Sequence, residues 1–197
     1  SQTQQIVYNF DDRKKKYHER IANNKDIADS FEHCLSCKAC KTECPTQVDI
    51  ATYKAEFMAA HYANKRRPVS HYPLAYIGNL LPKLSRFSGL VNMLQSGIIG
   101  KLAQHVLGLS SEKGLPKLAP QSFTNWAKKH AFRQDPQFYW FGAQDQPMVV
   151  LWADSVNNHY RPQLLQSAVN VLLKSGHQVA VAKQHFCCGR PLYEYGF

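Results

Sequence analysis

The spacing of apolar residues along the chain changes at Pro147. Before this residue, apolar side chains recur every three or four positions, which is typical of amphipathic helices. After it, two short apolar runs flank one longer helical segment, a pattern typical of a strand–helix–strand unit. The pattern therefore predicts a helical part followed by an α/β part.

The best-defined helix of the first part is predicted at Asp49–Asn64, with Asp49 as its N-cap and a basic end before Pro68. Its expected buried face consists of Ile50, Tyr53, Phe57 and Ala60. Further helices are predicted at Pro73–Phe87, Leu90–Leu107 and Ser122–His130.

The segment Leu90–Leu107 carries an apolar stripe made of Val91, Leu94, Ile98, Leu102 and Val106. We expect this stripe to pack against other helices of the same domain, and the alternative is contact with a membrane surface. Polar residues interrupt the apolar stretch Leu90–Leu109, so the sequence predicts no membrane-spanning helix.

The part after Pro147 predicts one βαβ unit. Met148–Trp152 is expected to be a buried strand, Arg161–Ser175 a helix and His177–Lys183 a second strand, parallel to the first. Because two strands do not make a stable layer, we expect more sheet beyond Phe197.

Four cysteines lie close together, at Cys34, Cys37, Cys40 and Cys44, and Pro45 follows them. The spacing C-x2-C-x2-C-x3-C-P is the ferredoxin-type pattern that holds iron–sulfur clusters. Structural zinc sites usually separate two C-x2-C pairs by a dozen or more residues. Disulfides across such short gaps are poor candidates in a chain without a secretory signature. The run therefore predicts a [4Fe-4S] cluster and one-electron transfer.

The spacing does not determine which cysteines complete the ligand set of this cluster. In ferredoxins of this type the cysteine before the proline, here Cys44, binds a second cluster, which needs another such run. The chain has no second run, and its other cysteines are Cys187 and Cys188. The cluster is completed locally, by this distant pair, or by cysteines outside these residues. The third option is favoured, because the chain, which begins with Ser1, reads as truncated at both ends.

Cys187 and Cys188 directly follow the second predicted strand, at the sheet edge where α/β proteins place their sites. Gly189 permits a positive φ, and Pro191 is suited to the first turn of a helix. Two thiols and Arg190 around a helix start would suit a cluster or a substrate. The alternative is a buried, inert cysteine pair.

The cysteine run and the CCG motif together resemble the iron–sulfur region of CCG-domain oxidoreductases. This group includes the glycolate oxidase iron–sulfur subunit and the heterodisulfide reductase subunits. The chain is most similar to flavoproteins that join an FAD-linked oxidase, of the D-lactate and D-2-hydroxyglutarate dehydrogenase type, to a C-terminal iron–sulfur half. The strings CLSCKACKTECPTQVDIATYKAEF, VVLWADSVNNHYRPQL and FCCGRPLYEYGF carry the resemblance.

The resemblance implies that a 2-hydroxy acid is oxidised at FAD and that electrons then pass through clusters to a quinone or a redox protein. It implies cluster ligands at Cys34, Cys37, Cys40 and Cys44, and CCG thiols at Cys187 and Cys188. FAD would belong to the parent protein or to a partner domain, because these residues include no FAD-binding segment. No catalytic residue is assigned to the chain.

The expected fold is a helical ferredoxin-like [4Fe-4S] domain followed by the start of an α/β CCG domain. Residues 1–110 would form the first, residues 111–146 a linker with a short helix, and residues 147–197 the second. The aromatic segment Phe138–Phe141 of the linker is expected to pack the two domains together, and the alternative is contact with a flavin or quinone. The charge run Asp11–Lys16 is expected to begin a solvated helix.

The chain is basic, with a formal net charge of +10. Such an excess suggests an anionic partner, or a positive surface near an anionic cluster, to which Lys38 and Lys41 would contribute. A metal-stabilised nucleic-acid-binding module is the alternative function, but the basic residues are scattered and we expect no nucleic acid. Cysteine clusters without an export signal predict a cytoplasmic protein, with peripheral membrane contact as a further option.

Overall fold

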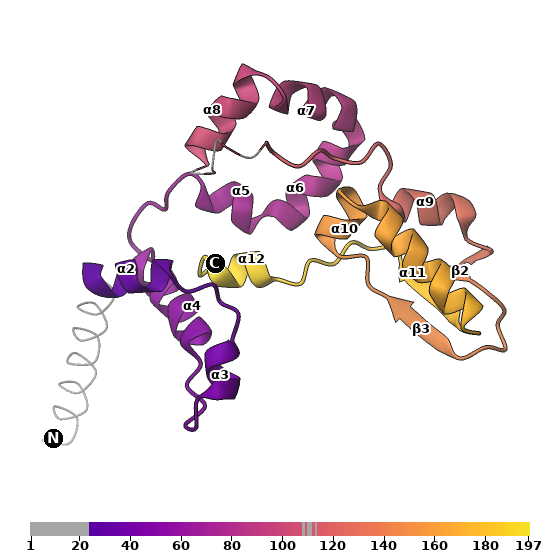
Figure 1. Cartoon of the computed structure of the whole chain (residues 1–197), viewed down its shortest axis with the longest axis horizontal. Coiled ribbons are helices and arrows are strands. Elements are labelled where there is room, and N and C mark those ends of the chain that lie inside the picture. Colours follow the sequence, from indigo (N-terminus) through magenta and orange to yellow (C-terminus); the bar gives the residue numbers. More distant parts are fainter. Residues whose placement is uncertain (1–23, 108, 110–111, 113) are drawn as a thin grey trace, which may run out of the picture. The chain divides into compact units, whose positions relative to one another are not determined.

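The computed structural model describes residues 24–197 except 108, 110, 111 and 113. They form two compact units (Figure 1). The first holds the described part of Ser1–Ala75 together with Gly189–Phe197, and the second holds that of Tyr76–Cys188. The chain therefore leaves the first unit after Ala75 and re-enters it at Gly189, directly after the paired cysteines.

These units divide the chain at other residues than the boundaries at 110 and 147 that the sequence predicts. The helix expected from Asp11–Lys16 lies outside the described residues.

Short helices build the first unit. They are α2 (Lys25–Glu32), α3 (Ala39–Glu43), α4 (Ile50–His61), α5 (His71–Ala75) and α12 (Arg190–Glu194). The side chain of Asn24 caps α2, and that of Asp49 caps α4 by accepting the N–H of Thr52 over 3.0 Å. Both side chains satisfy N–H groups that have no partner within the helix. The helix predicted from Asp49 is thus confirmed.

The buried face of α4 differs from the predicted one. Ile50 and Tyr53 are exposed, although the apolar spacing places them inside. The buried side chains are Ala51, Lys54, Ala55 and Phe57. Apolar spacing could not find this face, because one of its members is a lysine that is buried with polar partners.

Helices also form the N-terminal part of the second unit: α6 (Ile77–Leu84), the 3₁₀ turn η1 (Ser85–Phe87), α7 (Ser88–Gln95) and α8 (Ile98–Val106). The helix predicted over Leu90–Leu107 is two helices, because Ser96 and Gly97 between them are not helical. Gly97 is extended and precedes the first residue of α8. Among the described residues, no helix is both long and apolar enough to cross a membrane.

The predicted βαβ unit is confirmed. Strand β3 (Met148–Leu151) lies parallel to β4 (Gln178–Ala182), with Val149 opposite Val179. The connection contains α10 (Ser155–His159) and α11 (Pro162–Lys174), which ends before Gly176 at φ 77°. A positive φ just past a helix C-terminus favours glycine, because glycine has no Cβ that would clash there.

The sheet has two further strands on its other side. Helix α9 (Phe123–His130) precedes β1 (Arg133–Gln134) and β2 (Phe138–Phe141), and the strand order is β1-β2-β4-β3. Strand β2 runs antiparallel to β4. The aromatic segment expected to join two domains is thus a sheet strand, with Tyr139 and Phe141 pointing into the core.

Helices α9 and α11 cover one face of this sheet. The core consists of Phe123, Ala127, Tyr139, Phe141, Leu165, Val169, Val179 and Val181. Strand β4 is central and buried, whereas β3 exposes Met148 and Val150, so the expectation of a fully buried first strand was wrong. The described fold is therefore mixed, helical with one small four-stranded sheet.

Candidate functional site

The cysteine run winds through a loop, a short helix and a turn of the first unit. Cys34 follows α2, Cys37 lies in the loop, Cys40 lies in α3 and Cys44 caps the end of that helix. Cys37 is exposed and the other three are partly buried. The loop twists tightly because Ser36 and Lys38 have φ values of 51° and 62°. Left-handed residues other than glycine are uncommon and mark loops that their surroundings hold in place.

All six cysteines of the chain are free thiols. Within the described part of the chain, no three His, Cys, Asp or Glu side chains are gathered closely enough to hold a metal ion. The four cysteines of the run therefore lie in one short segment, but their sulfur atoms do not converge on a common metal position.

Cys44 has the most polar surroundings of the run. Its Sγ lies 3.1 Å from the hydroxyl of Thr46. This hydroxyl, followed by the backbone N–H groups of Val48 and Thr46, lowers the pKa of the Cys44 thiol by stabilising the thiolate. N–H groups directed at a sulfur are the kind of contact that iron–sulfur proteins make to their clusters.

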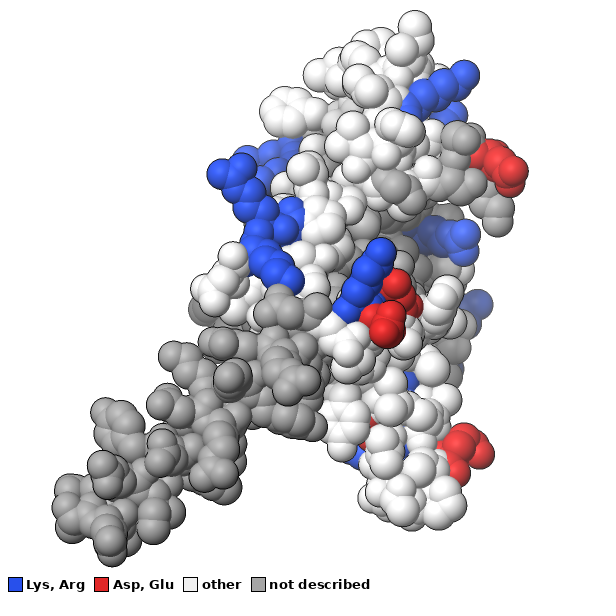
Figure 2. Space-filling model, turned by 90° about the vertical axis from the view of Figure 1, so that its left-hand side faces the viewer, with Lys and Arg blue, Asp and Glu red and all other residues white. Residues whose placement is uncertain are grey.

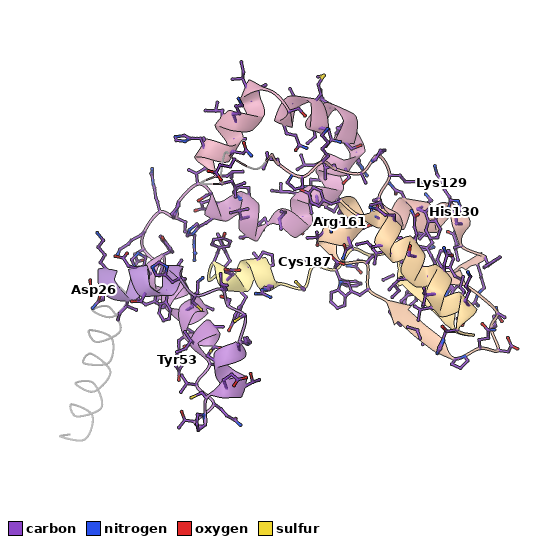
Figure 3. All side chains as sticks on the ribbon, viewed as in Figure 1. Asp26, Tyr53, Lys129, His130, Arg161 and Cys187 are labelled. Carbon is purple, nitrogen blue, oxygen red and sulfur yellow. The ribbon has the colours of Figure 1, made fainter. Side chains whose placement is uncertain are left out.

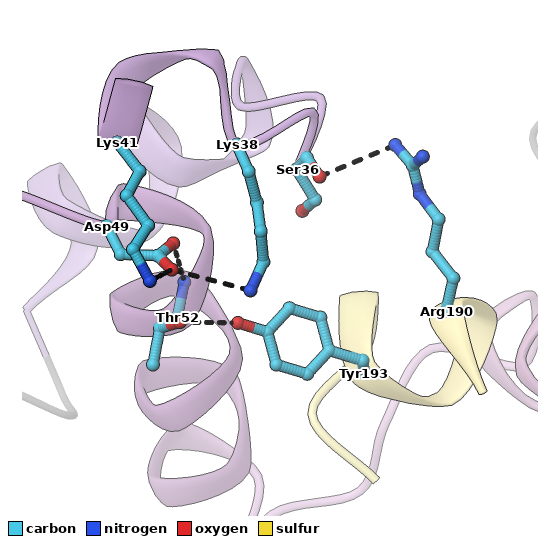
Figure 4. Close-up of polar contacts among 7 residues, drawn as sticks. All are labelled: Ser36, Lys38, Lys41, Asp49, Thr52, Arg190 and Tyr193. Atoms are coloured by element: carbon cyan, nitrogen blue, oxygen red, sulfur yellow. Dashed lines mark hydrogen bonds and ion pairs between the residues drawn. The ribbon is translucent and has the colours of Figure 1, made fainter. Parts of the chain in front are cut away.

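Ser36 lies between the first two cysteines of the run, and its hydroxyl is buried without a hydrogen-bond partner among the described residues. Its carbonyl oxygen and that of Leu35 accept hydrogen bonds from the guanidinium of Arg190, over 3.4 and 3.1 Å. Figure 4 shows the bond to Ser36. A buried hydroxyl without a partner is costly, so a ligand that accepts its proton would relieve the site.

Lys38 and Lys41 do not stand alone beside the cysteines. Both pair with the carboxylate of Asp49, at 3.4 and 3.7 Å (Figure 4). The N–H of Thr52 and then the ammonium of Lys38 lower the pKa of Asp49. Asp49 thus offsets part of the positive charge that the sequence predicts for this loop.

Helix α12 follows the CCG motif and belongs to the first unit. Gly189 precedes it with φ 76°, and Pro191 lies in its first turn, as the sequence predicts. The hydroxyl of Tyr193 donates to Thr52 of α4 over 2.7 Å (Figure 4). Together with Arg190, this contact attaches the CCG-following helix to the cysteine loop.

Cys187 and Cys188 are the last residues of the second unit. Figure 3 labels Cys187, which precedes α12 along the chain. Cys188 is exposed and Cys187 is partly buried, packed against Gly78 of α6. A Cβ at Gly78 would lie 2.8 Å from both Cβ and Sγ of Cys187. The close packing of Cys187 therefore requires glycine at position 78. No motif or spacing in the sequence indicates this contact.

A histidine pair lies near Cys187. His185 Nε2 is 3.2 Å from the hydroxyl of Ser155, and its Nδ1 is buried without a hydrogen-bond partner among the described residues. His159 Nδ1 is 2.7 Å from the hydroxyl of Ser85. Burial, and then the nearby His185, lower the pKa of His159 to about 4, so its ring is neutral near pH 7.

A mostly apolar cavity of about 230 Å³ opens at the carboxyl ends of β3 and β4. Trp152, His185 and Phe186 are among the residues that line it. Its place at the ends of parallel strands is that of many ligand sites in α/β proteins. The segment leading into the CCG motif thus forms part of a cavity wall.

Comparison with known proteins finds that the chain is similar in sequence to part of a class of dehydrogenases. The particular relatives are D-2-hydroxyglutarate dehydrogenases: one from Pseudomonas putida is 22% identical over 87% of this chain, and one from Escherichia coli is 24% identical over 78%. The chain spans 17% and 15% of the lengths of these two relatives.

The resemblance to D-2-hydroxyglutarate dehydrogenases that the motifs predict is thereby confirmed. No protein-family model matches the chain. No solved structure matches it either. The assignment to an iron–sulfur and CCG region, and the role of each cysteine, stay predictions.

Proposed function

We propose that this chain transfers electrons through a [4Fe-4S] cluster as part of a flavin-dependent oxidoreductase that acts on 2-hydroxy acids. The observation that carries the proposal is the ferredoxin-type spacing of four free thiols in one tightly twisted loop. The relatives support the reaction class, since they are named for the oxidation of one 2-hydroxy acid.

Two features of the loop suit an iron–sulfur cluster. The buried hydroxyl of Ser36 has no hydrogen-bond partner among the described residues and would donate to a cluster sulfur. The hydroxyl of Thr46 and backbone N–H groups already favour the thiolate form of Cys44, which is the form that binds iron.

Cys34, Cys37 and Cys40 would hold the cluster, and Cys44 would complete it or bind a second one. A cluster held by these residues would supply one-electron transfer. The chain's own residues fix the loop that surrounds it. Arg190 holds the carbonyls of Leu35 and Ser36 and adds a positive charge, which favours the reduced state. Cys187 and Cys188 would be ligands of a further metal centre or contacts to a redox partner.

The wider role follows from the relatives and is part of the proposal. An FAD-binding oxidase domain or subunit would oxidise the 2-hydroxy acid and deliver electrons to this chain. The acceptor would be a quinone or a redox protein. D-2-Hydroxyglutarate, D-lactate and glycolate are the substrates to test first.

Anaerobic reconstitution with iron and sulfide tests the cluster directly. We expect a brown protein with about four irons per cluster and a paramagnetic signal after reduction with dithionite. Cys37→Ser should lower the iron content strongly, whereas Phe132→Ser, at an exposed site of the second unit, should leave it unchanged. A colourless protein that binds zinc alone would disprove the proposal.

Ser36→Ala tests the fit of the loop to the cluster. We expect the cluster to form, but with a lower reduction potential, because one hydrogen bond to the cluster is lost. Ser70→Ala, outside the cysteine loop, is the matched control. An unchanged reduction potential in Ser36→Ala would show that this hydroxyl does not donate to the cluster.

A flavin dehydrogenase of the D-2-hydroxyglutarate type tests the wider role. Mixed with the reconstituted chain and substrate under anaerobic conditions, it should reduce the cluster without dithionite. If dithionite reduces the cluster but flavin enzyme and substrate do not, the electron-transfer role stands and the assignment to 2-hydroxy-acid oxidation fails.

A further inference from the structure

Helices α7 and α8 expose their apolar sides. Ile98 is 87% exposed, Met93 65% and Leu102 63%. We define the α7–α8 face as Leu90, Met93, Ile98, Ile99, Leu102 and Val106, all of which are exposed. The expectation that this stripe packs inside the helical domain is therefore wrong for Leu94 of α7 and for its three residues in α8. Several exposed apolar side chains on two helices that contact each other mark an interaction site more often than a chance exposure.

The polar sides of both helices face inward. The side-chain amide of Asn92 donates to the carbonyl of Leu118 and accepts the N–H of the same residue, each over 2.8 Å. Gln104 of α8 is buried beside Gly100. Since buried polar groups need partners, these contacts fix which side of α7 points outward. The apolar exposure is thus built into the fold.

Helices α6, α7 and α8 together carry basic residues and no acidic ones. The sequence contains no Asp or Glu between Glu56 and Glu112. Lys83, Arg86 and Lys101 are exposed on the helical part of the second unit, and Lys101 lies in α8 beside Leu102. Uncharged side chains cover most of the upper end of Figure 2, with basic and acidic side chains at its right. Helices that expose aliphatic and basic residues and contain no acidic ones complement an anionic lipid surface.

We propose that the α7–α8 face binds the surface of an anionic lipid bilayer. The helices have eight and nine residues, so they would lie in the headgroup region with their aliphatic side chains in the acyl boundary. Lys83, Arg86 and Lys101 would contact lipid phosphates. A second copy of the chain fits this face less well, because it would bring basic residues against their own counterparts.

The proposal does not rest on the iron–sulfur cluster, and the test uses the chain without added iron. The full chain is floated with vesicles of phosphatidylcholine alone, and with vesicles that also contain about one third phosphatidylglycerol. We expect flotation with the anionic vesicles that weakens at high salt, and little or none with the neutral ones. Equal binding to both vesicles, or binding to neither, would overturn the proposal.

The double variant Ile98→Ser and Leu102→Ser should weaken binding to the anionic vesicles by at least about tenfold. The matched control is Leu164→Ser and Val171→Ser in α11, two apolar residues that are also exposed. Both double variants should keep the thermal stability of the parent chain, since they change exposed positions. An equal loss of binding in both would overturn the assignment to this face.

A reporter at the same positions gives an independent readout. Leu102→Trp should show a blue-shifted emission with anionic vesicles, whereas Val171→Trp should not, because an indole in the interface leaves water. Sedimentation of the free chain completes the test. Self-association that Ile98→Ser and Leu102→Ser abolish, without flotation, would assign this face to a second copy and overturn the membrane proposal.

Discussion

The ammonium of Lys54 donates a hydrogen bond to the backbone carbonyl of Cys34 over 2.7 Å. Lys54 is only 7% exposed, and its second partner is the carboxylate of Glu194 at 3.6 Å. A lysine of α4 thereby joins the first cysteine of the run to the helix that follows the CCG motif. The contact organises the first unit around the cysteine loop, before any ligand is bound.

Lys54→Met should destabilise the first unit by about 2 kcal/mol, because it leaves the carbonyl of Cys34 and the carboxylate of Glu194 without their buried partner. Denaturant unfolding measures this loss. Lys101→Met, at an exposed site, should change the free energy of unfolding by less than about 0.5 kcal/mol. Equal effects of the two substitutions would show that the Lys54 contacts add no stability.

Stability should fall in mild acid because of His159, which is 4% exposed. Its pKa is about 4 in the folded chain against an ordinary value of 6.5, so between these values the unfolded chain binds a proton that the folded chain does not. The free energy of unfolding is therefore largest above the ordinary value and falls as the pH drops toward 4, by up to about 3 kcal/mol from this group.

His159→Gln should remove this part of the pH dependence, since glutamine does not titrate. Unfolding curves at several pH values between about 4.5 and 7.5 measure the slope. His130→Gln, at an exposed histidine, should keep the slope of the parent chain. If His159→Gln also keeps that slope, another group is responsible for the acid sensitivity.

Gly78→Ala should cost about 1–3 kcal/mol, because its new Cβ would collide with Cys187 in a packed region. Cys187→Ala in the same chain should restore part of the loss by removing one of the two close atoms. Gly89→Ala in α7, where the added Cβ meets nothing within 4 Å, should leave stability unchanged or raise it by less than about 1 kcal/mol. A harmless Gly78→Ala would mean that Cys187 is not held where the structure places it.

Asn92→Ala should cost about 2 kcal/mol, because it removes the two hydrogen bonds to Leu118 and leaves both backbone groups of that residue without the Asn92 side chain. Thermal unfolding measures the effect. The exposed Asn79→Ala, in α6, is the control and should change stability little. A small effect at position 92 would show that the polar side of α7 is not fixed by these contacts.

Local sequence signals predicted the elements whose cause is local. The N-cap at Asp49, the helix end at Gly176 and the positive φ of Gly189 all follow from residue chemistry at those positions. The parallel strands also followed from the apolar runs around a helical segment. Period and capping depend on neighbours in sequence, so they could be read without the fold.

The placement of β2 depended on the fold. Phe138–Phe141 is too short and too uniformly aromatic to be distinguished from a packing segment by its period. The segment forms a strand because it pairs with β4, which lies about forty positions later in the chain. Sheet pairing is non-local, and no spacing rule within the segment encodes it.

The sequence by itself determined the candidate chemistry of this protein. The reason is that the spacing of Cys34, Cys37, Cys40 and Cys44 along the chain does not depend on the fold. The tertiary structure alone decided which charges reach that loop: Asp49 pairs with its lysines, and Lys54 and Arg190 hold its carbonyls. It also decided that Ile98 and Leu102 point outward. The physical reason is that burial and hydrogen bonding depend on partners distant in sequence, which apolar periodicity does not record.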